Sequence, residues 1–259
     1  MATKKQQWTR EQLVLAFDLY CQTPFGKMYS KNPTIVQLAN VVGRTPSAVA
    51  MKLVNFASLD PQITASGRAG LGNASAADKR IWEEFHADWE RLALEAELLR
   101  RNLGLPTAPD QDADIGIPIT DNFLGETRSA LVEQRIKQGF FRRAVLSSYR
   151  GKCCMSGLSE PSLLVASHIV PWSADKFNRL NPSNGLCLSV LHDKAFDRGL
   201  IAVSEDLKII VSERLLSRDE PFVRQVFVPL RKTRIELPER FAPDIAFLAR
   251  HRAEVFLDN

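Results

Sequence analysis

The sequence predicts an α+β protein in two parts: a helical domain over residues 1–103 and a smaller mixed domain over residues 123–259. Helical periodicity recurs up to about residue 102, and the order strand, long loop, strand, short helix follows in the second half. Between them, "GLPTAPDQDADIGIPITDN" (104–122) holds three prolines and four aspartates without periodicity, which is typical of a linker. A chain of 259 residues is long enough for two such domains.

Composition and charge restrict the classes of protein to consider. Hydrophobic residues make up 45% and charged residues 25%, as in an ordinary soluble globular protein. The net charge of +4 permits an anionic partner but is too small to demonstrate one. No apolar run is long enough to span a membrane, and the N-terminus lacks a signal-peptide core, so we expect a cytoplasmic protein without a membrane partner. Four cysteines without CxxC pairs indicate neither a disulfide framework nor a zinc ribbon.

Three helices are predicted near the N-terminus. The first covers residues 9–22 with Thr9 as N-cap, and the second runs through "PTIVQLANVV" to Gly43. The third, "RTPSAVAMKLVNFASL", begins with Thr45 as N-cap and Pro46 at the first helical position. This layout is that of a helix-turn-helix, although a small helical bundle explains the pattern equally well. As a reading helix, it would present to a DNA groove the residues Arg44, Ser47, Met51, Lys52 and Asn55, with Val49, Leu53 and Phe56 toward the core.

The rest of the first domain is predicted to be a loop and one long helix. "DPQITASGRAGLGNASAADK" is rich in Gly, Ala and Ser and has room for a short wing or for a phosphate contact at Arg68. A helix from Ser75 to Asn102 follows, in which large apolar residues form one stripe typical of a buried face: Ile81, Phe85, Trp89 and Leu92.

The second domain begins with a basic helix, about Glu126 to Ser148, in which Arg142 and Arg143 are candidates for phosphate contacts. "LLVASHIV" is then predicted to be a strand that ends before Pro171, and "GLCLSV" a second strand after an irregular loop. A short helix, "LHDKAFDRG", closes at Gly199. In an antiparallel hairpin crossed by this helix, three side chains at element ends would converge: His168, Asn184 and His192.

These motifs resemble those of the HNH nucleases with a ββα-metal fold, particularly the subgroup found in bacterial restriction enzymes. The resemblance is carried by "SHIVPW", "NPSNGLCLS" and "HDKAFDRGL", together with the basic helix and "FLARHRAEVF" near the end of the chain. The N-terminal half is similar, with weaker support, to the winged-helix or helix-turn-helix modules sometimes fused to such nucleases.

The resemblance implies a metal-dependent DNA endonuclease. His168 would be the general base, His192 would bind a divalent metal, most often Mg²⁺ or alternatively Mn²⁺, and Asn184 would orient His168 or brace the loop. One departure is Ser167, where many relatives carry a metal-binding aspartate or histidine, and a hydroxyl is a poor ligand for a hard cation. Asp193 and Asp197 are candidates to complete the metal site. Arg179 and Lys194 are candidates to contact phosphate. Asp197 is better suited to capping or bracing the turn around Arg198 and Gly199 than to binding the metal.

Partners and an alternative function follow from the same reasoning. The substrate would be double-stranded DNA, cutting both strands would favour a homodimer, and the N-terminal module would read the target. The resemblance to fused restriction enzymes implies a methylated base as one target, which Val49, Met51 and Phe56 would shelter. The alternative is a catalytically inactive DNA-binding regulator that keeps a nuclease-like fold. Ser167 is the feature in its favour, whereas the joint presence of His168, Asn184 and His192 favours the enzyme.

Overall fold

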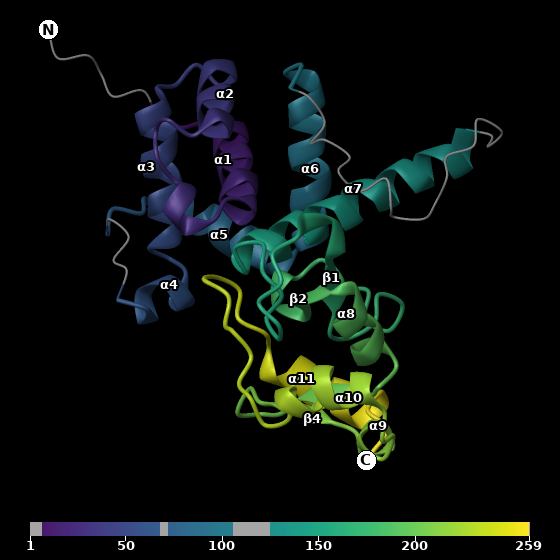
Figure 1. Ribbon diagram of the computed structural model, residues 1–259. Helices are drawn as coiled ribbons and strands as arrows, with labels where there is room; N and C mark the ends of the chain where they lie inside the picture. Colours follow the sequence, from purple (N-terminus) through teal and green to yellow (C-terminus); the bar gives the residue numbers. More distant parts are fainter. Residues whose placement is uncertain (1–6, 68–71, 106–124, 259) are drawn as a thin grey trace, which may run out of the picture. The chain divides into compact units, whose positions relative to one another are not determined.

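The computed structural model describes residues 7–67, 72–105 and 125–258 (Figure 1). The chain divides into two units, residues 1–140 (unit 1) and 141–259 (unit 2). The division falls inside helix α7 (Gly125–Ser148), which matches the predicted basic helix. Residues 106–122 of the predicted linker (104–122) lie outside the described residues, and so does Arg68.

Unit 1 is built from helices around α1 (Arg10–Gln22). Thr9 caps α1 with a capping box, as its sequence predicts: its side chain accepts from the Gln12 N–H, and the Gln12 side chain accepts from the Thr9 N–H. Both sides of α1 are buried, because it packs against four other helices of the unit. The described helices of unit 1 besides α1 and α7 are η1 (Phe25–Lys27), α2 (Pro33–Val41), α3 (Pro46–Ala57), α4 (Pro61–Ala65), α5 (Ala76–Ala87) and α6 (Trp89–Asn102).

The predicted turn between α2 and α3 is confirmed. Gly43 lies at φ +65°, a conformation that glycine adopts without steric cost, and lets the chain reverse after α2. Thr45 then caps α3 by accepting from the Ala48 N–H, with Pro46 in the first turn. The two helices pack against each other. No strand occurs among the described residues of unit 1, so a winged-helix domain is not confirmed.

The long helix expected from Ser75 to Asn102 is wrong: the chain breaks at Asp88 into α5 and α6. Asp88 has a non-helical backbone (φ −152°, ψ 81°), and its Oδ1 accepts from the Arg91 N–H, so it caps α6. The bend lets both Phe85 and Trp89 pack near Phe17 in the core, with ring centroids at 6.1 and 6.2 Å. The expected burial of Ile81, Phe85, Trp89 and Leu92 is confirmed, although these residues lie on two helices and not on one.

Unit 2 contains the predicted strand, loop, strand and helix. Strands β1 (Leu164–His168) and β2 (Gly185–Ser189) are antiparallel, with Leu164 opposite Ser189 and His168 opposite Gly185. Helix α8 (Val190–Asp197) follows directly, is capped by the Ser189 side chain, and packs on both strands. Figure 1 shows α8 beside the hairpin.

The C-terminal half of α7 packs on the hairpin so closely that only glycine fits at position 185. A Cβ placed there would clash with the Val145 and Phe141 side chains, because it would lie closer to both than van der Waals contact allows. Phe141 and Val145 are themselves buried in the core of unit 2, together with Leu186, Leu188 and Phe196. The end of β1 that carries His168 is therefore held against α7.

The remaining elements of unit 2 complete its core. A second antiparallel pair, β3 (Ile201–Val203) and β4 (Ile209–Val211), follows α8. The other described helices are η2 (Pro161–Leu163), η3 (Pro182–Asn184), α9 (Glu213–Leu216), α10 (Pro221–Val226), η4 (Val228–Leu230) and α11 (Ile245–Glu254). α11 contains most of "FLARHRAEVF" and packs on β3.

Two further expectations concern cysteines and membranes. All four cysteines, Cys21, Cys153, Cys154 and Cys187, are buried free thiols, as expected from their spacing. Within the described ranges, no helix combines the length and the apolar composition needed to cross a membrane.

Candidate active site

The loop between β1 and β2, residues 169–184, closes one end of the hairpin; we call it the active-site loop. His168 is the last residue of β1 and lies opposite Gly185, so it stands beside Asn184, which ends η3 and precedes β2. The strand stops because Pro171 has no N–H to donate to the sheet. The hairpin therefore brings His168 and Asn184 together at its loop end, as predicted.

His168 is fixed in position and in tautomer. Its Nε2 lies 2.9 Å from the Arg179 carbonyl oxygen, which can only accept, so Nε2 carries the proton and Nδ1 keeps a lone pair. The ring stacks on Phe141 (centroids 3.8 Å apart) and meets Trp172 edge-on (5.5 Å). Burial among these groups lowers the pKa of His168 to about 4, against the opposing effect of the Arg179 carbonyl. His168 is therefore neutral at pH 7.

Asn184 braces the active-site loop. Its Oδ1 accepts from the Val170 N–H (2.8 Å), while Nδ2 donates to the Val170 and Asn178 carbonyls (3.2 and 3.3 Å). The side chain is fully buried. Of the two roles that the sequence left open, these contacts match bracing, and the group that orients His168 is the backbone of Arg179.

His192 lies buried in the first turn of α8. Its Nδ1 is 2.8 Å from the Ser189 hydroxyl and 3.7 Å from the Cys153 sulfur, while its Nε2 is buried with no hydrogen-bond partner among the described residues. A ring held through one nitrogen with the other left without a partner is the arrangement that metal-binding histidines show. His192 therefore fits the role of one ligand to a divalent ion.

Ser167, Asp193 and Asp197 lie in the same region, but they do not form a complete ligand set. The Ser167 hydroxyl is buried and has no hydrogen-bond partner of normal length in the described part of the chain. Burial raises the pKa of Asp193, and the nearby Ser167 hydroxyl opposes that effect. Burial also raises the pKa of Asp197, and the Asp193 charge adds to it, so the two carboxyls sense each other. Among the described residues, no three His, Cys, Asp or Glu side chains are arranged to hold a metal ion.

The basic residues expected to contact phosphate in unit 2 differ in their positions. Lys194 is exposed on α8, whereas Arg143 is half-buried. Arg142 donates from Nη1 to the Leu164 carbonyl (2.8 Å), so it supports β1. The Arg179 guanidinium lies over the Trp172 ring at 5.0 Å, within the active-site loop.

Only some of the residues expected to face outward from α3 and its N-terminal turn are exposed. Ser47 and Met51 are exposed on α3, and half-buried Arg44 donates from Nη2 to the Gln12 side chain (2.9 Å). The expectation that Lys52 and Asn55 face outward is wrong, because both are buried. Lys52 Nζ contacts both carboxylate oxygens of Asp78 on α5, at 2.8 and 3.0 Å.

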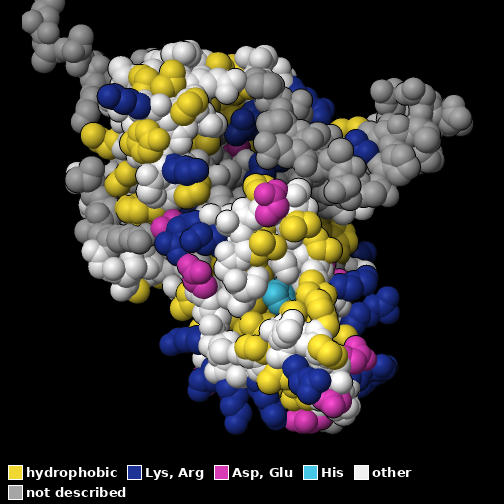
Figure 2. All heavy atoms as spheres, in the orientation of Figure 1, with side chains coloured by type: hydrophobic (Ala, Val, Ile, Leu, Met, Phe, Trp, Pro, Cys, Tyr) yellow, Lys and Arg dark blue, Asp and Glu magenta, His cyan; other side chains and the backbone are white. Residues whose placement is uncertain are grey.

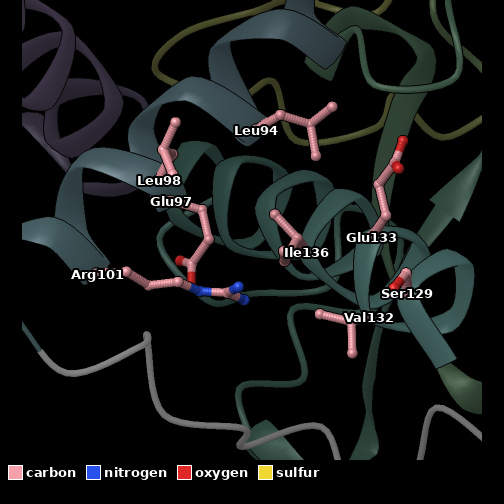
Figure 3. A pocket seen from close by; sticks show the side chains of 8 residues that line it. All are labelled: Leu94, Glu97, Leu98, Arg101, Ser129, Val132, Glu133 and Ile136. Atoms are coloured by element: carbon pink, nitrogen blue, oxygen red, sulfur yellow. The ribbon is translucent and has the colours of Figure 1, made fainter. Parts of the chain in front are cut away.

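A second concave surface lies in unit 1, between α6 and the N-terminal half of α7 (Figure 3). It encloses about 430 Å³ and is lined by Leu94, Glu97, Leu98, Arg101, Ser129, Val132, Glu133 and Ile136. Its ionic groups are engaged locally: Arg101 pairs with Glu97 at 2.9 Å, and Glu133 pairs with Lys137. The residues that line this groove include no histidine or cysteine.

Sequence reasoning missed three groups that position the two histidines. The Arg179 carbonyl has no side-chain signal, and the Phe141 stack joins residues far apart in the chain. Ser189 did have a signal, because a serine directly before a short helix is a common N-cap.

Comparison with known families agrees with this site. Residues 153–204 match the family model described as HNH endonuclease, a segment of less than a quarter of the chain that includes His168, Asn184 and His192. No curated protein matches the chain. The matched segment supports a nuclease-type function, for which DNA is the implied substrate.

Proposed function

We propose that this protein is a metal-dependent DNA endonuclease of the restriction kind, with His168 as the general base. One observation carries the proposal: within the HNH-like segment, the Arg179 carbonyl holds Nε2–H of His168 and leaves Nδ1 as an acceptor. A neutral imidazole fixed in one tautomer is what proton abstraction from water requires.

Phosphodiester hydrolysis has three requirements: deprotonating water, compensating charge on the phosphate, and stabilising the leaving oxygen. Nδ1 of His168 takes the proton from the attacking water. The Arg179 carbonyl then stabilises the imidazolium that forms, because it already accepts from Nε2–H. Phe141 and Asn184 keep the ring and the loop in place while the proton moves.

A divalent ion, most often Mg²⁺ with Mn²⁺ as an alternative, would be held by Nε2 of His192 with help from the Asp193 carboxylate. Mg²⁺ is commonly bound by few protein ligands, with water and phosphate oxygens completing its shell. When bound, the ion supplies positive charge to the phosphate and to the leaving oxygen. Ser167 and Asp197 would contribute through water, since their positions do not complete a direct ligand set.

Target reading is assigned to unit 1. On α3, Ser47 and Met51 are exposed and Arg44 precedes the helix, whereas Val49 and Phe56 are fully buried in the core. A methylated base would therefore meet Met51 alone, and the part of the expectation that involved Val49 and Phe56 is wrong. Cutting both strands calls for two catalytic units, so we propose a homodimer on DNA.

The surface of unit 2 suits an anionic substrate. Figure 2 shows Lys and Arg side chains gathered beside β4. The exposed basic residues that flank this strand are Lys208, Arg231, Lys232 and Arg234. Lys208 and Arg231 are paired with Asp206 and Glu213, so Lys232 and Arg234 are the better candidates for phosphate contacts. Phosphate contacts do not read sequence, which leaves base reading to another element.

Plasmid cleavage tests the proposal. Supercoiled plasmid from methylating and non-methylating hosts is incubated with Mg²⁺ or Mn²⁺, and wild type is compared with His168→Ala. His86→Ala is the matched control, because this histidine also contacts aromatic rings, those of Trp82 and Trp89, but lies on α5 of unit 1. We expect cleavage by wild type and by the control, at least about 100-fold slower cleavage by His168→Ala, and none in excess EDTA.

Three results separate the alternatives. Equal cutting of the two plasmids would exclude methylation as the signal. Cleavage by His168→Ala at the wild-type rate would exclude His168 as the general base. A protein that binds DNA but neither cleaves it nor binds a divalent metal would match the inactive DNA-binding regulator.

A further inference from the structure

Phe177 in the active-site loop is almost entirely exposed. Its side chain is 94% accessible, whereas the next most accessible large hydrophobic residue in the described part of the chain, Leu98, is 58% accessible. Single exposed hydrophobic residues are common on protein surfaces and need no explanation by themselves. What sets Phe177 apart is how its backbone is held and what lies beside it.

The turn around Phe177 is held by side chains. Asp175 Oδ1 accepts from the backbone N–H groups of Phe177 (3.0 Å) and Asn178 (3.1 Å), and Asp175 Oδ2 accepts from the Asn178 side chain (2.8 Å). The Asn178 carbonyl in turn accepts from Asn184 (3.3 Å). The aromatic ring is therefore displayed by a braced turn.

The same turn is tied to the proposed base. Arg179 lies two residues after Phe177, a separation of at most about 7 Å along the chain, and its carbonyl holds His168. The backbone of Phe177 therefore lies near the His168 ring, which makes its exposed side chain a candidate to contact a DNA strand bound at His168.

The neighbours of Phe177 favour a nucleic acid over a protein. Lys176 is exposed beside it, and the Arg179 side chain lies over Trp172 in the same loop. Lysine is depleted in protein–protein interfaces, whereas a cation next to an exposed aromatic ring suits a base flanked by phosphates.

We propose that Phe177 stacks on or wedges between bases of duplex DNA next to the cleaved phosphate, while Lys176 contacts the phosphate backbone. The inference rests on the proposed nuclease function, since it takes His168 as the place where the phosphate lies. Apolar side chains inserted at a base step unstack it and bend the duplex. Such a wedge fixes the position of the strand relative to His168 and favours easily unstacked steps at the cut site.

Binding measurements on a non-cleaving background test the wedge. Phe177→Ala, Phe177→Trp and Phe222→Ala are each combined with His168→Ala and titrated with short plasmid-derived duplexes containing 2-aminopurine. Phe222 on α10 is the matched control, an exposed phenylalanine (55%) outside this loop. We expect Phe177→Ala to weaken duplex binding roughly 5- to 100-fold and to remove the rise in 2-aminopurine fluorescence. Phe177→Trp should restore both, and Phe222→Ala should change binding by less than twofold.

Several outcomes overturn the wedge. They are unchanged binding and fluorescence in Phe177→Ala, an equal loss in Phe222→Ala, and no duplex binding by the parent protein. The two proposals fail separately. If His168-dependent cleavage survives while Phe177→Ala behaves as wild type, the nuclease stands and the wedge fails. If Phe177 governs binding but wild type never cuts, the wedge stands and the catalytic proposal fails.

Discussion

Asn184 and Val170 exchange two hydrogen bonds across the active-site loop. Oδ1 of Asn184 accepts from the Val170 N–H at 2.8 Å, and its Nδ2 donates to the Val170 carbonyl at 3.2 Å. The same Nδ2 reaches the Asn178 carbonyl. The buried Asn184 side chain thus holds both Val170, at the start of the loop, and Asn178, which lies between Phe177 and Arg179.

Asn184→Ala should therefore destabilise the protein markedly. Three backbone groups would lose their partner inside the protein, and each unsatisfied group costs about 1 kcal/mol or more, so we expect a loss of about 2–4 kcal/mol in the free energy of unfolding. Urea unfolding measures it. Asn181→Ala is the control, because that side chain accepts a single hydrogen bond from Ser183 in the same loop. A loss no larger than that of the control would refute the bracing role.

Ser189→Ala should weaken metal binding. The hydroxyl lies 2.8 Å from Nδ1 of His192, and loss of a group that orients a metal-binding histidine commonly costs 10- to 100-fold in metal affinity. Calorimetric titration with Mn²⁺ measures this. Ser212→Ala removes the equivalent N-cap from α9, so it should cost similar stability, about 1 kcal/mol, and leave metal affinity unchanged. Equal Mn²⁺ affinity in Ser189→Ala and wild type would show that Ser189 does not position His192 for metal binding.

His251 should make the protein less stable in acid. Its ring stacks on Phe196 (3.7 Å) and its Nε2 bonds the Phe196 carbonyl (3.1 Å), and burial lowers its pKa to about 4. The unfolded chain binds the proton first as the pH falls, so stability is unaffected above about pH 7 and decreases between about 6.5 and 4. A shift of this size corresponds to about 3 kcal/mol.

Urea unfolding at pH 7 and pH 4 compares wild type with His251→Phe, which keeps an aromatic ring against Phe196. The decrease in stability between the two pH values should be about 3 kcal/mol smaller in the variant. An identical decrease in both proteins would show that His251 does not titrate in this window. His168 contributes in the same direction, because burial also lowers its pKa to about 4.

Lys52 should matter for stability and not for direct DNA contact. Lys52→Met would leave the buried Asp78 carboxylate without its cation, a change that costs about 3–5 kcal/mol in comparable buried pairs. Part of the charge stays stabilised, because Asp78 also accepts from the Ser75 N–H. Met51→Ala, at the exposed neighbouring position, should change stability by less than about 0.5 kcal/mol. Equal stabilities of the two variants in denaturant unfolding would contradict the role given to the ion pair.

Features with local signals could be predicted from the sequence. The caps at Thr9 and Thr45, the turn at Gly43 and the hairpin followed by α8 depend on neighbouring residues, and all are present. The placement of His168, Asn184 and His192 at element ends followed from the same local patterns.

Features that depend on long-range contacts could not be predicted. The helix break at Asp88 brings Phe85 and Trp89 near Phe17, a residue on another helix, and the periodicity of this segment does not show that contact. Lys52 is buried because Asp78 lies opposite it on another helix. The hydrogen-bond partner of His168 is the backbone carbonyl of Arg179, eleven residues away, and the residue type at that position does not predict such a contact.

The pH dependence of single-turnover cleavage at saturating Mn²⁺ tests the role of His168 most directly. Because burial lowers the pKa of this histidine to about 4, the rate should change little between about pH 7.5 and 5.5 and fall only near pH 4. His168→Ala should be at least about 100-fold slower across the range. A rate that halves near pH 6.5, or wild-type rates in His168→Ala, would contradict a neutral, half-buried His168 as the base.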